Sequence, residues 1–136
     1  MNAKQLKRLQ HGITQLAYGD VLPKGFEFNM AKFADPYHLS EASVCGSVGC
    51  LLGSLSYVFP KSVAISWRIF AYEFVSDSLE WKWVFDEDWA EYDNSMEGAL
   101  QRAQYLIDHG VPDNFTGVGG EIEWKDWYEN AEVRNA

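Results

Sequence analysis

Apolar residues recur at helical spacing over the first eighteen positions of the chain. The members of this stripe stand at steps of three and four residues: Leu6, Leu9, Ile13 and Leu16. Mostly polar and basic side chains occupy the positions between them. The pattern predicts an amphipathic helix over residues 2–18 that buries one face, with Gly19 just after its end.

Two segments in the middle of the chain also carry helix signals. Ser47 is a good N-cap for a helix that runs to about Phe59, because Pro60 cannot continue it. Residues 62–75 place aromatic and small apolar side chains on one face, which predicts the next helix.

A further helix is expected over residues 95–109. Asn94 or Ser95 can cap its start, and alanine and leucine side chains recur along one face. Gly110 suits its end, and Pro112 prevents its resumption.

The segment 79–85 can be interpreted in two ways. Its large apolar residues alternate as in a strand, but Trp81, Val84 and Trp89 also fit one helical face. A strand here would need residues 26–30 as its partner, because an isolated strand is not stable. We favour a helical or turn conformation, and the alternative is a two-stranded ribbon of 26–30 with 79–85.

These patterns predict a mainly α fold, a single compact helical domain of about four to five helices over residues 1–136. The composition agrees, since 47% of the residues are hydrophobic and 15% are aromatic, as in globular rather than disordered chains. Near the end of the chain one helical face is shared by three aromatic residues, Trp124, Trp127 and Tyr128. They predict a short helix docked on the domain's own core.

Apolar runs in the chain are all short. None approaches the roughly 20 residues of a membrane-spanning helix, and the first residues lack the apolar core of a signal peptide. We therefore expect a cytoplasmic protein that does not bind membranes.

Charge is distributed unevenly between the two ends of the chain. Residues 1–34 carry five basic and two acidic side chains, a net charge of +3, whereas residues 77–136 carry four basic and fifteen acidic ones, a net charge of −11. This balance argues against direct binding of nucleic acid, which requires cations that replace counterions. The acidic half suits docking on a basic partner. The carboxylates that we predict to carry such an interaction are Asp86, Glu87, Asp88, Glu91, Asp93 and Glu97.

Both cysteines lie in one glycine-rich motif, Cys45-Gly46-Ser47-Val48-Gly49-Cys50-Leu51-Leu52-Gly53. A thiol at the start of a helix can be activated by the helix dipole, which makes a cysteine-dependent hydrolase with Cys45 as nucleophile and His109 as base one hypothesis. A histidine in the last turn of a helix is, however, well explained as a charge that complements the dipole. The hydrolase is therefore the alternative rather than the leading interpretation.

Metal binding would draw on Cys45, Cys50 and His38, with His11 as a fourth ligand. Four residues separate the two cysteines, and no second pair of ligands with zinc-site spacing follows. We therefore predict no metal site and no cofactor.

The motif is best explained by packing. Gly46, Gly49 and Gly53 would place small residues near one side of a helix, where another backbone can approach closely. Cysteine is among the residue types most often buried. On this interpretation Cys45, Gly46, Ser47, Gly49, Cys50 and Gly53 are a structural motif.

The same motif resembles one found in a family of small, mostly uncharacterised proteins of tailed bacteriophages and prophages, with the pattern F-x-M followed by C-G-[ST]-x-x-C-x-x-G. Phe28-Asn29-Met30 and Cys45 to Gly53 carry the resemblance here, and the later run from Trp81 to Pro112 is similar as well. The resemblance implies a phage accessory protein made in the host cytoplasm, and it brings no catalytic residues.

The leading hypothesis is a non-enzymatic phage accessory protein that binds a bacterial host or defence protein with a basic surface through its acidic half, in one version as a mimic of nucleic acid. The sequence indicates neither the partner nor the oligomeric state.

Overall fold

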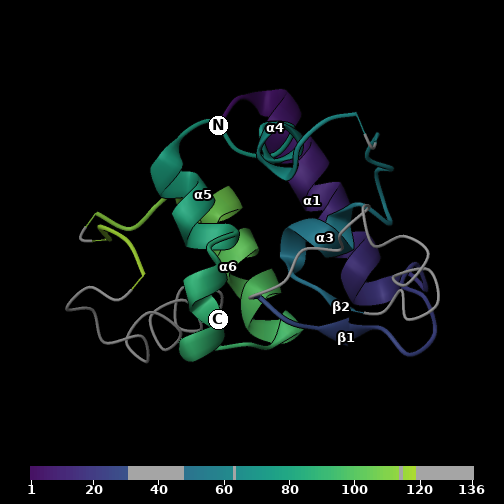
Figure 1. Cartoon of the computed structure of the whole chain (residues 1–136). Coiled ribbons are helices and arrows are strands. Elements are labelled where there is room, and N and C mark those ends of the chain that lie inside the picture. The colour runs from purple at the N-terminus through teal and green to yellow at the C-terminus, as the bar shows by residue number, and fades with distance from the viewer. Residues whose placement is uncertain (31–47, 63, 114, 119–136) are drawn as a thin grey trace.

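The computed structural model describes residues 1–30, 48–62, 64–113 and 115–118. Five α-helices, one 3₁₀ helix and two short strands lie within these residues. In chain order they are α1 (Ala3–Tyr18), β1 (Glu27–Phe28), β2 (Val48–Gly49), α3 (Leu51–Leu55), α4 (Trp67–Ala71), α5 (Ser78–Val84), η2 (Glu87–Glu91) and α6 (Met96–His109) (Figure 1). The protein is a mainly α domain, as the apolar patterns predict.

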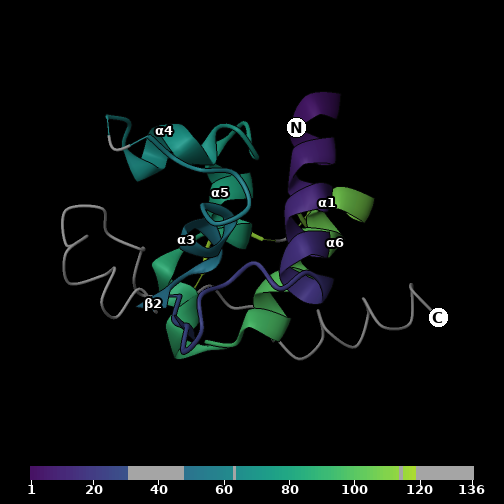
Figure 2. The same ribbon diagram turned by 90° about the vertical axis from the view of Figure 1, so that its right-hand side faces the viewer.

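The longest helices, α1 and α6, pack against each other and lie side by side in Figure 2. α5 packs on α6, and α3 contacts both α1 and α6. Gly12 on α1 allows this close approach, because a Cβ atom there would collide with the side chain of Leu55. All these elements share one hydrophobic core, to which η2 contributes Trp89 and the segment after α6 contributes Phe115.

The two long helices match the predicted ones closely, because both have strong caps. Asn2 and Gln5 form a reciprocal capping box at the start of α1, with N–O distances of 2.8 and 2.9 Å. The Ser95 hydroxyl accepts from the Gly98 amide at the start of α6, and Gly110 ends that helix at a φ of 78°.

The segment 79–85 is helical, as favoured, and the proposed ribbon of 26–30 with 79–85 is wrong. Asp77 and Glu80 form a capping box that starts α5, and the indole of Trp83 turns inward to donate to the carbonyl of Arg102 at 2.8 Å. The strand at Glu27–Phe28 pairs instead with β2, in parallel.

The helix predicted from Ser47 begins later than expected. Val48 and Gly49 belong to β2, and the N-cap of α3 is Cys50, whose Sγ accepts from the Gly53 amide at 3.4 Å. Ser47 lies outside the described residues. Gly49 is therefore in a strand, and it does not share a helix face with Gly53.

The helix predicted over 62–75 is reduced to α4. Its start is fixed by the Ser66 hydroxyl, which accepts from the Ile69 amide at 3.1 Å. Beyond Ala71 the backbone tightens to i→i+3 bonds, and the carbonyls of Tyr72 and Val75 accept hydrogen bonds from the side chain of Gln5 at 2.9 and 3.0 Å. A distant side chain thus takes the acceptors that a longer helix would use.

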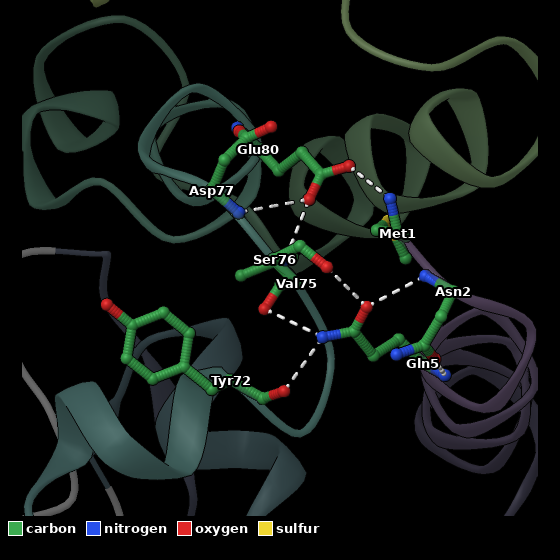
Figure 3. Close-up of polar contacts among 8 residues, drawn as sticks. All are labelled: Met1, Asn2, Gln5, Tyr72, Val75, Ser76, Asp77 and Glu80. Atoms are coloured by element: carbon green, nitrogen blue, oxygen red, sulfur yellow. Dashed lines mark hydrogen bonds and ion pairs between the residues drawn. The ribbon is translucent and has the colours of Figure 1, made fainter.

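Gln5 is the centre of a polar network that joins α1 to the start of α5 (Figure 3). Its Oε1 accepts from the Ser76 hydroxyl at 2.6 Å. Glu80 completes the network: Oε1 accepts from the Ser76 amide at 2.7 Å, and Oε2 pairs with the Met1 ammonium group at 2.9 Å. Both charged groups are largely buried, so the two elements are held by polar contacts as well as by the core.

Within the described residues, no helix is both long and apolar enough to cross a membrane. The helix predicted around Trp124, Trp127 and Tyr128 lies outside them.

Candidate interaction surface

The segment between α5 and α6, which contains η2, is built around a buried tryptophan. Trp89 is 1% exposed, and its Nε1 donates to the Lys82 carbonyl at 2.9 Å. The indole stacks on Phe115 at 6.4 Å between ring centroids and meets Trp83 edge-on at 5.6 Å. These contacts fix η2 on the core, so the neighbouring side chains of the turn are directed to solvent.

Three carboxylates of η2 are exposed: Glu87, Asp88 and Glu91. Because a 3₁₀ helix has three residues per turn, Asp88 and Glu91 stand above one another on the same side. Tyr92 follows and is 46% exposed. We call Glu87, Asp88 and Glu91 the acidic turn.

Asp86 belongs to the structure of the turn rather than to its exposed face. Its carboxylate caps η2 by accepting from the Asp88 amide at 3.0 Å. Partial burial raises its pKa, and the charge of Asp88 adds to the increase.

Asp93 also makes internal contacts. Its Oδ1 accepts from the Ser95 amide at 3.1 Å and from the Ser95 hydroxyl at 2.5 Å. Its other oxygen lies 4.0 Å from a guanidinium nitrogen of Arg102 and rests against Gly98, where a Cβ atom would collide with it. The carboxylate thus links the start of α6 to a buried arginine.

Arg102 is a core residue that the sequence pattern does not single out. It is 1% exposed, and its guanidinium carbon lies 4.1 Å from the ring centroid of Trp89. The cation therefore packs on the face of the Trp89 ring and helps to hold η2 in place. The available signal is its position beside Ala99, Ala103 and Leu106 on the buried face of α6.

Glu97, the last of the six predicted carboxylates, is exposed in the first turn of α6. It lines a hollow between α6 and α1, together with residues such as Tyr18 and Leu100. The structure thus divides the predicted set: three carboxylates form the acidic turn, Asp86 and Asp93 make internal contacts, and Glu97 faces the side of α1.

The hydrolase hypothesis is tested only in part. Cys45 lies outside the described residues, so its pairing with His109 stays a prediction. His109 is exposed in the last turn of α6, with its ring 4.9 Å from that of Tyr105. A position at a helix C-terminus is where the dipole favours a cation.

The second cysteine of the motif is fully buried. Cys50 is 0% exposed, and burial raises the pKa of its thiol from 9.0 to about 11, against a smaller lowering by the Gly53 amide. Its thiolate form is therefore scarce at neutral pH. Among the residues that the structure describes, no three histidine, cysteine or acidic side chains are grouped as a metal site requires.

We expect iodoacetamide to leave Cys50 unmodified in the folded protein at pH 7, because the thiol is inaccessible and protonated. Peptide mass spectrometry resolves the two cysteines, and the same reaction in urea gives the unfolded control. Rapid labelling of Cys50 would contradict its assignment as a structural residue. Rapid labelling of Cys45 alone would support the hydrolase hypothesis.

Comparison with known proteins gives no family assignment: no protein-family model matches the chain, and neither a curated protein nor a solved structure matches it.

Proposed function

We propose that the protein is a non-enzymatic binding protein and that the acidic turn, Glu87, Asp88 and Glu91, contacts a basic surface on a partner protein. The observation that carries this proposal is the presentation of the turn. Three exposed carboxylates stand on one short element that a buried tryptophan holds in place. A rigid charged element loses little conformational entropy when it binds.

The charge of the whole chain supports the same proposal. The net charge is −9, so a basic partner would be attracted from a distance and its association accelerated. The motif resemblance supports the narrower proposal that the protein is a phage accessory protein and that its partner is a host or defence protein in the bacterial cytoplasm. Mimicry of nucleic acid would be one form of this interaction.

Capture experiments on bacterial lysate test the proposal with a matched pair of variants. The first variant carries Glu87→Gln, Asp88→Asn and Glu91→Gln. The control carries Asp20→Asn, Glu27→Gln and Asp113→Asn, which change the net charge equally at exposed sites outside the turn. The proposal predicts a protein that the wild type and the control retain at low salt and that the first variant loses.

Two results would contradict this proposal. One is the absence of any retained protein at low and moderate salt. The other is equal loss of the retained protein in both variants, which would indicate attraction by net charge alone. Release of the retained protein by added duplex DNA would favour nucleic-acid mimicry over the more general interaction.

A further inference from the structure

The exposed face of α1 carries a regular row of side chains, of which His11 contacts the ring of Phe59. Its members recur at steps of three and four residues: Lys4, Lys7, His11, Thr14 and Tyr18. Tyr18, at the end of the row, is 90% exposed, more than any other large hydrophobic residue described. Tyrosine is one of the residue types enriched at protein interfaces.

Two hollows adjoin this row, in the groove between α1 and α6. One, of about 310 Å³, lies toward the end of α1 and includes Ile13, Tyr18 and Leu100 in its lining. The other, of about 440 Å³, lies toward the start of α1 and includes Leu6 and Ile107. Gln10 and Thr14 line both hollows.

Gln10 also holds the groove together. Its side chain and that of Gln104 exchange two hydrogen bonds, of 3.1 and 3.0 Å, across the groove. The floor between the two hollows is therefore fixed, and binding there would not require the helices to separate.

The ends of the groove differ in charge. Lys7 and His11 line the hollow near the start of α1, and Glu97 lines the hollow near its end. Asp108 is exposed near the basic end, where it accepts a hydrogen bond from Gln104 at 3.1 Å. A surface with an aromatic group and a carboxylate at one end, and a basic hollow at the other, is complementary to a copy of itself turned end to end.

We propose that two copies of this chain pair through the α1–α6 face, with a two-fold axis in the interface near Thr14. Such an axis places each residue that follows Thr14 opposite the residue equally far before it in the other copy. Tyr18 then lies opposite Gln10, four residues on the other side of Thr14 and about 6 Å along the helix. Gln10 is part of the lining of the basic hollow.

The charged side chains are matched by the same operation. Glu97 of each copy comes over the end of the groove where Lys7 and His11 of the other copy lie. Tyr18 enters the basic hollow, where the side chains of Leu6 and Ile107 supply apolar surface for its ring. Both pairs of contacts occur twice because the interface is two-fold. This interface is separate from the acidic turn, so the pairing does not depend on the proposed function.

Analytical ultracentrifugation of the full chain, from about 1 µM to about 1 mM, tests the proposal. We expect a reversible dimer whose Kd rises at least about tenfold in Tyr18→Ala, because exposed aromatic anchors dominate such interfaces. Thr14→Arg should abolish the dimer, because it sets two like charges face to face at the axis. The control is Tyr72→Ala, at the exposed tyrosine that follows α4 as its C-cap, away from the groove, and it should leave the Kd unchanged.

A charge exchange makes the test specific to the proposed geometry. Lys7→Glu and Glu97→Lys should each weaken the dimer severalfold, and the double variant should recover most of the loss. Circular dichroism of each variant establishes that it is folded. A monomer at every concentration, or a dimer that Tyr18→Ala and Thr14→Arg leave intact, would overturn the proposal.

Discussion

Replacement of Trp89 by alanine is expected to lower the free energy of unfolding by about 3–5 kcal/mol, the range for large aromatic residues removed from a core. The change removes the hydrogen bond to the Lys82 carbonyl and the ring contacts with Phe115 and Trp83. It also takes away the aromatic face over which the buried Arg102 cation lies. Urea unfolding followed by circular dichroism measures the effect.

The acidic turn itself supplies the matched control for this change. Glu91→Ala alters an exposed residue two positions away on η2, and we expect it to change stability by no more than about 0.5 kcal/mol. Trp89→Phe should fall between the two, since it keeps much of the ring contact but loses the Nε1 hydrogen bond. A loss below about 1 kcal/mol for Trp89→Ala would contradict the view that this residue fixes the turn on the core.

Gln5→Ala is expected to cost about 2–4 kcal/mol, because one buried and two partly buried polar groups lose their partner at once. The carbonyls of Tyr72 and Val75 lose the Gln5 amide, and the hydroxyl of Ser76 loses its acceptor. Each unsatisfied buried group costs about 1–3 kcal/mol, although water can reach some of them after the change. The same urea unfolding measures the loss.

Another glutamine of α1 serves as the comparison. Gln10 makes an exposed bond to Thr14 and partly buried bonds to Gln104 beside an open groove. Water can replace a lost partner there, so we expect Gln10→Ala to cost less than about 1 kcal/mol. Equal losses in the two variants would contradict the view that the hydrogen bonds of Gln5 to Tyr72, Val75 and Ser76 stabilise the fold.

The sequence pattern predicted the long helices well because α1 and α6 combine a clear apolar stripe with strong local caps. It overestimated α4 because periodicity does not show which backbone carbonyls a distant side chain will take. Gln5 occupies a position on the buried face of α1 where an apolar residue would be expected. A polar residue at that position was the available signal of its distant hydrogen bonds. The position of β2 depends on pairing with a distant strand, which short two-residue segments do not reveal.

The negative charge of the candidate surface could be predicted from the sequence, but the carboxylates that are exposed on it could not. The excess of carboxylates between residues 86 and 97 is visible in the sequence. The use of Asp86 as a cap and of Asp93 as a partner of Arg102 depends on how Trp89 packs. For the same reason the groove beside α1, which Glu97 lines, emerges only when α1 and α6 are placed together.

The central claim is that a partner recognises the acidic turn itself rather than the negative charge of the whole chain. The most direct test is calorimetric titration of the purified captured partner with the wild type, the Glu87→Gln/Asp88→Asn/Glu91→Gln variant and the Asp20→Asn/Glu27→Gln/Asp113→Asn control. We predict a Kd raised at least about tenfold in the first variant and changed by less than about threefold in the control. Equal Kd values for the two variants would contradict the claim.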